Sequence, residues 1–394
     1  AASDVYKRQV LVVAQVAVSA MLLVCAGLFV RSLGNVNNVD TGFTLREGVV
    51  ATLEFQESGY GSEGGRAIVT ELKERLAALP GVLAVASCDR MPLGQSIAIT
   101  AVYPETPHVQ ADEDGVAVDI AAVGPDYFGA LGIPIQAGRA FNQTDLPESE
   151  RVVIVNSTFA RTHWPGESAI GKQVRVHGVD EEPRTIVGVA RDGKYRSLGE
   201  RPRPFLYQPY AQASFGLTHV VVASSVDGAN LVQPVRREIR ALDSNLPIFD
   251  LVTVPEHLEL MLFVPRALAA LLVTLGLLAL ALGSTGLYGV IAYDVSRRTR
   301  EVGIRISVGA RRSQVLRLVL WDGLRLVGIG TAAGLLIALP STRFLESMLF
   351  DIHPADPVTF VAVALLFLCV SVAATLRPGM RASSIDPVNA LRYE

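Results

Sequence analysis

The sequence is poor in cysteine, in charge and in paired histidines, and each shortage excludes a class of protein. Its three cysteines, Cys25, Cys88 and Cys369, are too few and too scattered for a disulfide framework or a zinc site. The six histidines never pair at metal-ligand spacing. Charged residues make up 19% of the 394 residues, and the net charge is −3. The sequence has no stripe of basic residues interleaved with aromatics, which is the pattern that indicates nucleic-acid binding. No triad or carboxylate constellation indicates an enzyme.

Long apolar runs are what the sequence has instead. Half of its residues are hydrophobic, and the mean hydropathy is +0.37. Residues 10–30 are 21 residues without a charge, about 31 Å of helix, which matches the thickness of a bilayer core. This run is too long for a signal-peptide core, so we expect a retained transmembrane helix. Similar runs at 267–292 and 358–376 predict two more.

A fourth transmembrane helix is expected at about 320–339, although it contains Asp322 and Arg325. Such a charge costs about 2.5–3.5 kcal/mol at the centre of a spanning helix and much less near its end. Both charges lie near the start of this run, so we expect them at the membrane interface. Gly330 and Gly334 form a small-xxx-small pattern, which predicts close packing against another helix.

The arginine distribution predicts the orientation. The loop 293–317 contains seven arginines against two acidic residues, whereas the loop 341–357 has one arginine against three acidic residues. The tail 377–394 adds three more arginines. The positive-inside rule therefore places both termini and the arginine-rich loop in the cytoplasm, and residues 31–265 outside.

Residues 31–265 are too long for a connector and are expected to form an α+β domain. Its two ends repeat a strand–helix–strand pattern, which predicts paired β-α-β halves at 47–90 and 217–255 around an insert, 91–216. The predicted strands are 48–55, 82–88, 219–224 and 248–254, with 152–155 and 185–189 in the insert, and the predicted helices are 62–79 and 230–242.

One stretch resembles a phosphate-binding loop. Residues 166–174 read GESAIGKQV, but Gln173 stands where the Mg²⁺-binding hydroxyl is required. The stretch also runs into an alternating, strand-like pattern, so we predict a glycine-rich turn that enters a strand. His163, just before it, is interpreted as a turn residue, and Asp112-Glu113-Asp114 as a solvated loop, not a metal site.

Several segments together resemble one family. They are VAQVAVSAMLLVCAGLFVRSL near the start, VGPDYFGALGIPIQAGRAF, VVIVNSTFARTHWPGESAIGKQV and TIVGVARDGKYRSL in the outside domain, GLYGVIAYDVSRRTREVGIRISVGARRSQVLRLVL, and SIDPVNALRYE at the end. Their order is similar to that of the MacB/FtsX-like ABC-transporter permeases, with duplicated orphan permeases closest. Residues 1–9 look unrelated, and we interpret them as a non-native or truncated start.

The resemblance implies four transmembrane helices in the bacterial inner membrane, a MacB-like periplasmic core domain between the first two, and an FtsX-like permease domain at 266–394. It further implies an ABC ATPase partner that binds ATP and Mg²⁺, no cofactor bound directly, a dimer of permease units and contact with lipids. A periplasmic adaptor is another partner to consider. The predicted function is export or mechanotransmission. The alternatives are a scaffold that regulates a periplasmic enzyme and a permease that releases lipoproteins.

The cytoplasmic loop is the predicted coupling site. Residues 299–307 can form a short helix with Val302 and Ile306 on one face. Arg298, Glu301 and Arg305 lie on or near another face. A membrane-surface helix that only obeys the positive-inside rule explains this pattern equally well, and the resemblance favours coupling to the ATPase.

The ends of the coupling segment and of the chain add two expectations. Gly309, next to Ala310, permits a sharp turn after the short helix. In the tail, Asp386 can cap a helix that starts at Pro387. Val388 and Leu391 would then face the membrane or the partner.

Overall fold

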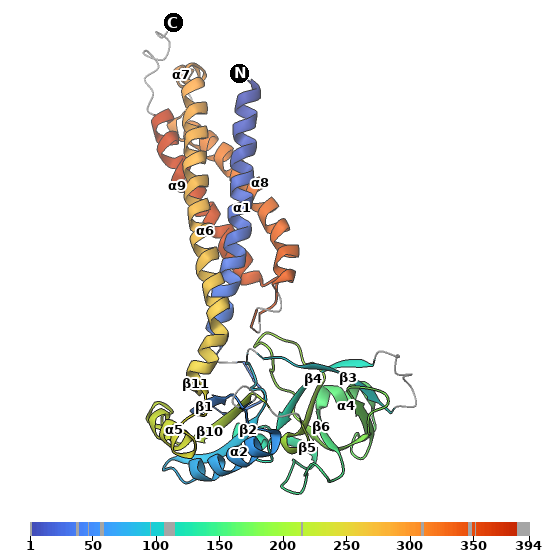
Figure 1. Ribbon diagram of the computed structural model, residues 1–394. Coiled ribbons are helices and arrows are strands. Elements are labelled where there is room, and N and C mark those ends of the chain that lie inside the picture. The colour runs from blue at the N-terminus through green and yellow to red at the C-terminus, as the bar shows by residue number, and fades with distance from the viewer. Residues whose placement is uncertain are drawn as a thin grey trace. The chain divides into compact units, whose positions relative to one another are not determined.

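The computed structural model describes residues 2–36, 39–45, 47–55, 59–94, 96–105, 115–213, 216–308, 311–345, 349–350 and 352–383. The chain divides into two compact units. One comprises Ala1–Asn37 and Val264–Glu394, and the other Asn38–Phe263. The first is built from helices and the second from strands and shorter helices (Figure 1).

Among the described residues, four helices are long and apolar enough to cross a membrane. They are α1 (Ala2–Asn35), α6 (Val254–Arg297), α8 (Arg312–Phe344) and α9 (Pro357–Ser383). All four extend beyond the predicted spans, because an apolar run marks the part of a helix that suits lipid and not the points where its hydrogen bonding begins and ends.

Helix α6 extends furthest beyond its predicted span, since the span begins at residue 267 and the helix begins at Val254. A capping box explains the early start. The Thr253 N–H donates to Glu256 Oε2 at 2.8 Å, and the Glu256 N–H donates to Thr253 Oγ1 at 3.3 Å. Pro265 lies inside the helix without ending it. The polar turns between the cap and the apolar run are therefore helical too.

The loop between α8 and α9 is tied to the end of α1. Arg31 forms an ion pair with Asp356, and the same carboxylate accepts from the Thr359 N–H at 2.9 Å in the first turn of α9. Ser32 Oγ accepts a hydrogen bond of 2.6 Å from the Phe350 N–H. These contacts hold α9 to α1 at this end of the helical unit.

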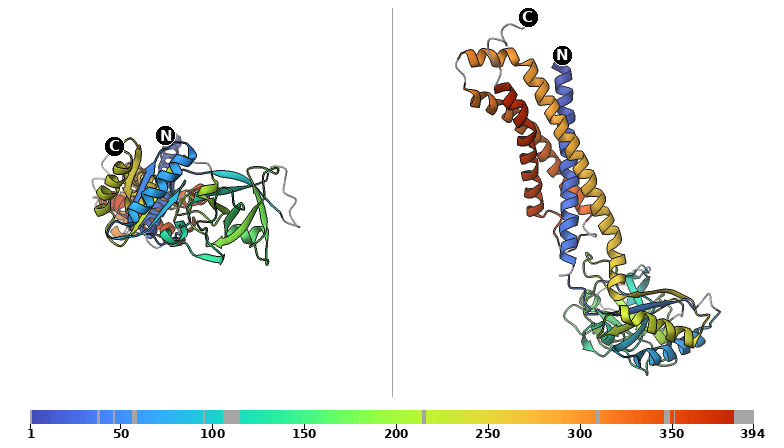
Figure 2. Two further views of the ribbon diagram at one scale, coloured as in Figure 1. Left: turned by 60° about the horizontal axis from the view of Figure 1, so that its bottom comes forward. Right: turned by 90° about the vertical axis from the view of Figure 1, so that its left-hand side faces the viewer.

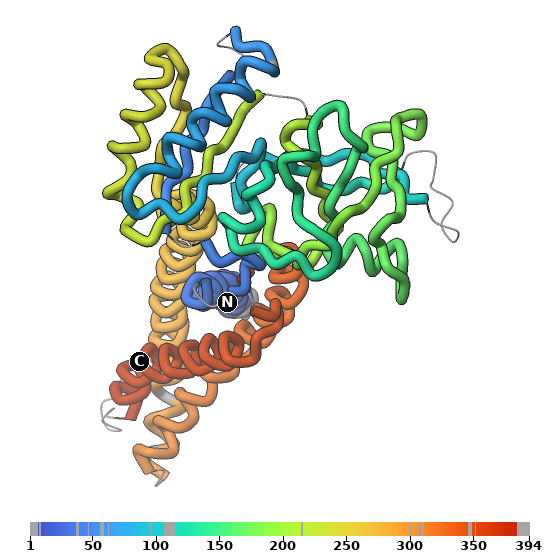
Figure 3. Tube along the Cα trace, turned by 90° about the horizontal axis from the view of Figure 1, so that it is seen from below, coloured from blue at the N-terminus to red at the C-terminus, as the bar shows by residue number. Residues whose placement is uncertain are grey.

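In the second unit, the two β-α-β segments form one side of a sheet in the order β11-β1-β10-β2. All neighbouring pairs there are antiparallel. The elements are β1 (Gly48–Leu53), α2 (Ser62–Ala77), β2 (Val82–Cys88), β10 (Thr218–Ser224), α5 (Ala229–Leu242) and β11 (Ile248–Thr253). Figure 3 shows α2 and α5 running side by side. Their apolar faces share a core with β1 and β10 that includes Leu72, Val222 and Val235.

The insert closes into a ring of strands that the sequence did not predict. The ring runs β4-β3-β7-β8-β6-β9 and returns from β9 to β4 by a parallel pairing. Its members are β3 (Ile99–Pro104), β4 (Val116–Val123), β6 (Val152–Asn156), β7 (Gln173–Val176), β8 (Arg184–Ala190) and β9 (Phe205–Pro209). Strand β5 (Ile135–Gly138) pairs with β8. The insert also contains the helices α3 (Tyr127–Leu131) and α4 (Ser157–His163), and the 3-10 helix η2 (Tyr210–Gln212) follows β9. The insert is not a separate sheet, because Cys88 in β2 pairs with Val123 in β4.

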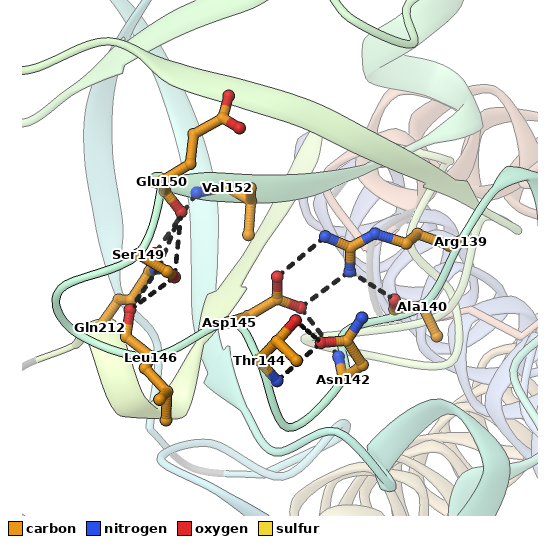
Figure 4. A network of polar contacts seen from close by, with 10 residues as sticks. All are labelled: Arg139, Ala140, Asn142, Thr144, Asp145, Leu146, Ser149, Glu150, Val152 and Gln212. Carbon is orange, nitrogen blue, oxygen red and sulfur yellow. Dashed lines mark hydrogen bonds and ion pairs between the residues drawn. The ribbon is translucent and has the colours of Figure 1, made fainter.

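A polar network holds the loop between β5 and β6. Arg139 makes two hydrogen bonds of 2.8 Å to the carboxylate of Asp145, which also accepts from the Asn142 N–H at 2.8 Å. Gln212 Nε2 donates to the Leu146 carbonyl oxygen at 3.0 Å (Figure 4). The bidentate charged pair thus fixes the shape of this loop, and Gln212 ties it to η2.

Candidate functional site

The predicted coupling segment forms α7 (Thr299–Ser307), between the end of α6 and the start of α8. It turns away from the axis of α6 (Figure 2). Val302 fixes α7 to the helical unit, because its side chain is 6% exposed and belongs to the same buried cluster as Val315 and Val319 of α8. Burying one valine contributes about 1.5–3 kcal/mol. The short helix is therefore packed against α8 through Val302.

Arg298 links three parts of this region. Its guanidinium lies 3.4 Å from Asp294 Oδ1 in α6 and 3.5 Å from Asp322 Oδ2 in α8. Asp322, whose charge is costly inside a membrane, thus has a cationic partner. Within α7, Arg305 and Glu301 form a pair of 2.6 Å one turn apart. Exposed pairs of this kind contribute at most about 1 kcal/mol each, so they orient the helix more than they stabilise it.

Two apolar side chains that the sequence analysis did not single out project from α7. Ile304 is 46% exposed, and Val308, directly after the helix, is 82% exposed. They are four residues apart and so share one face of the helix. The four-residue spacing of Ile304 and Val308 is visible in the sequence, but the predicted apolar face contained only Val302 and Ile306.

Part of the predicted coupling site lies outside the described residues. Gly309, Ala310 and the side chain of Ile306 are in this group, as is the tail from residue 384 onward with Asp386, Pro387 and Leu391. Their proposed roles remain predictions.

The space enclosed by the ends of α6, α7 and α8 is small. The cavity lined by Asp294, Arg298, Val302 and Asp322 measures about 20 Å³, which is room for a water molecule and far too little for a nucleotide. Among the described residues, no group of three or more His, Cys, Asp or Glu side chains could hold a metal ion.

Gly330 and Gly334 face α1. A Cβ atom on Gly334 would lie 2.4 Å from the Ala17 carbonyl oxygen, and one on Gly330 would lie 2.8 Å from Val16 Cβ. The two backbones thus approach closely where these glycines lie, as the small-xxx-small pattern predicts.

The loop that resembles a phosphate-binding loop is a turn that enters a strand. Lys172 pairs with Glu167 at 2.9 Å, and β7 begins at Gln173, with no helix in the position that phosphate binding requires. His163 is a correction, because it is the last residue of α4 and buried instead of lying in a turn. The acidic cluster at 112–114 lies outside the described residues.

Two family models match the chain. The model of the MacB-like periplasmic core domain matches residues 11–242, and the model of the FtsX-like permease C-terminal region matches residues 273–387. Together these matches include most of α1, most of the second unit and the segment from the apolar part of α6 to α9.

Individual relatives and solved structures are also similar. The macrolide export ATP-binding/permease protein MacB of Escherichia coli (strain K12) is 29% identical over 294 residues, which are 70% of this chain and 44% of that protein. The protein of the same name from Marinobacter nauticus is 26% identical over 271 residues, 66% of this chain and 41% of that protein. The chain thus spans less than half the length of these relatives. The crystal structure of the periplasmic region of MacB from Actinobacillus actinomycetemcomitans aligns with 57% of this chain and 93% of that one, with 15% identity and a TM-score of 0.36.

Proposed function

We propose that this chain, which belongs to the MacB/FtsX-like superfamily of ABC transporter permeases, is the permease component of an ATP-driven export or mechanotransmission system. ATP is hydrolysed by a partner ATPase subunit or by a domain outside this sequence. The observation that carries the proposal is the arrangement of α7. This helix is fixed to its neighbours by Val302 and Arg298. The side chains of Ile304 and Val308 are exposed on its surface.

Such a helix is suited to bind in a groove of a partner protein. Helix-in-groove recognition uses apolar anchors three or four residues apart, which is the spacing of Ile304 and Val308. The charged pair of Arg305 and Glu301 adds polar groups near these anchors. A partner that moves this face moves α6 and α8 as well, because Val302 and Arg298 connect α7 to α8 and α6.

Helix α6 leads away from α7 along the chain. Helix α6 has 44 residues from Val254 to Arg297 and starts directly after β11 of the second unit. At 1.5 Å per residue it is about 66 Å long, roughly twice the thickness of a bilayer core. Helix α6 is thus long enough to cross a membrane and is joined directly to β11 in the sequence.

The experiment compares two valine substitutions in the full chain. Val308→Asp places a charge on the exposed face of α7, and Val179→Asp makes the same change at a half-exposed valine in the second unit. The chain is co-expressed with its ABC ATPase subunit, and the complex is purified and its ATPase activity measured. We expect Val308→Asp to weaken the complex about tenfold or more, because it places a charge where an apolar anchor is buried.

The control keeps this result interpretable. Val179→Asp should leave the complex and its ATPase activity unchanged, and both variants should keep the melting temperature of the parent chain because both sites are exposed. If Val308→Asp binds and stimulates the ATPase as the parent does, α7 is not the coupling element.

A further inference from the structure

A polar cleft in the second unit has no place in the coupling mechanism. It measures about 290 Å³, at the lower end of the size of ligand pockets. Four segments contribute to it: the loop before β1, strand β5, helix α4 and the loop after β8. Its polar side chains include Gln136, Ser157, Arg161, Arg191 and Lys194.

The two carboxylates of the cleft already have partners. Asp192 accepts from the Thr158 N–H at 2.7 Å and from Arg161 Nη2 at 2.9 Å. Asp40 accepts from the Gly42 N–H at 3.0 Å and forms an ion pair with Arg191. These carboxylates are therefore occupied in positioning the loops and the two arginines.

The cleft still has hydrogen-bond donors that a ligand could use. Lys194 has an ammonium group with three donor hydrogens, and it donates to the Glu200 carbonyl oxygen. In the part of the chain that the structure describes, no carboxylate forms an ion pair with it. Arg161 makes its hydrogen bonds through Nη2 alone, to Asp192 and to Thr158 Oγ1, so its other nitrogens can still donate. Three cations, Arg161, Arg191 and Lys194, thus face two carboxylates.

We propose that this cleft binds a small molecule through an oxyanion, a carboxylate or a phosphate group. A guanidinium and an ammonium that converge on one space are the groups that proteins use for such anions. Ser157 Oγ donates to Gln136 Oε1 at 2.5 Å and to the Ala190 carbonyl oxygen at 3.1 Å, so the Gln136 amide nitrogen is the neutral donor that can bond the rest of the ligand. The proposal does not depend on the coupling role of α7.

The test is titration calorimetry of the purified full chain in detergent. Inorganic phosphate and acetate are titrated separately, with the ionic strength held constant by chloride. We expect saturable binding of at least one of the two anions. Arg161→Gln and Lys194→Gln should each weaken it about tenfold or more, because each removes a charge-assisted donor. Lys172→Gln is the matched control, since Lys172 pairs with Glu167 and does not line the cleft.

The outcomes separate the sources of the anion. Binding of phosphate alone assigns a phosphorylated ligand, and binding of acetate alone assigns a carboxylate. Arg161→Gln is the safer of the two variants, because the Arg161 side chain is 68% exposed and its loss leaves the fold intact. The proposal is wrong if neither anion binds, or if binding is the same in the parent, in Arg161→Gln and in Lys194→Gln.

Discussion

The imidazole of His163 is buried without a hydrogen bond to any described residue. It is 7% exposed, and its ring centroid lies 4.5 Å from that of Phe159. Trp164 Nε1, beside it, also lacks a partner among the described residues. A neutral imidazole carries one N–H, and leaving such a donor buried and unpaired costs about 1–3 kcal/mol. Burial also lowers the pKa of His163, because the charged form is poorly solvated.

Acid should therefore destabilise the protein through His163. The unfolded chain has the ordinary histidine pKa, so below about pH 6.5 it binds a proton that the folded state binds only at lower pH. Stability from this residue is complete above that pH and declines as the pH falls toward the lowered pKa of the folded state. We expect His163→Phe to raise the melting temperature at pH 7.5 and to raise it further at pH 5, measured by thermal unfolding in detergent.

The comparison variant is His353→Phe, at an exposed histidine. It makes the same substitution at an exposed position, and its melting temperature is measured at the same two pH values. Equal pH dependence in the parent and in His163→Phe would show that His163 does not titrate differently in the folded state.

At the scale of helices, the contact between α1 and α8 depends on the absence of side chains. Gly334 lies where a Cβ atom would meet the Ala17 carbonyl oxygen at 2.4 Å, whereas Gly328 in the same helix has nothing within 4 Å. We expect Gly334→Val to force the two helices apart and destabilise the helical unit by about 1–3 kcal/mol, the usual cost of overpacking. Thermal unfolding of the full chain in detergent measures this change.

Gly328→Val is the matched control because both substitutions place the same side chain in α8. Its melting temperature should stay close to that of the parent, apart from the small effect of helix propensity. A Gly334→Val variant that unfolds at the same temperature as Gly328→Val would contradict the close packing.

Hydrophobic pattern was a good guide to elements and a poor guide to how they pair. The predicted helix 299–307 coincides with α7, and the predicted strand 82–88 coincides with β2. Both follow from local periodicity. The ring of the insert depends on β4 pairing with β9, about 80 residues later in the chain, and alternation within a strand does not name its partner.

The site shows the same division between local and distant information. The buried position of Val302 follows from the apolar face of a short helix. The bridge from Arg298 to Asp322 joins residues in different helices, so no spacing rule predicts it. The start of α6 could have been predicted from the sequence, because Thr253 and Glu256 have the spacing of a capping box. The prediction from the apolar run alone did not include this signal.

For the whole molecule, the arginine distribution and the fold lead to one proposed orientation. We propose that α7 lies on the cytoplasmic side, within reach of an ATPase, because the positive-inside rule predicts that side for the seven arginines at 293–317. The same rule places the second unit in the periplasm. Ile304 and Val308 can serve as anchors for an ATPase only if this orientation is right.

Labelling of single cysteines tests the orientation in cells. Cys25, Cys88 and Cys369 are replaced by alanine, and one cysteine is introduced by Val308→Cys or by Phe249→Cys, both at strongly exposed side chains (82% and 79%). A maleimide that does not cross the inner membrane should label the Phe249→Cys variant in intact cells. It should label the Val308→Cys variant only after the membrane is permeabilised, because the proposed orientation, predicted by the positive-inside rule, has the arginine-rich segment in the cytoplasm. The reverse pattern of labelling would place α7 in the periplasm, out of reach of any ATPase, and the proposed coupling would fail with it.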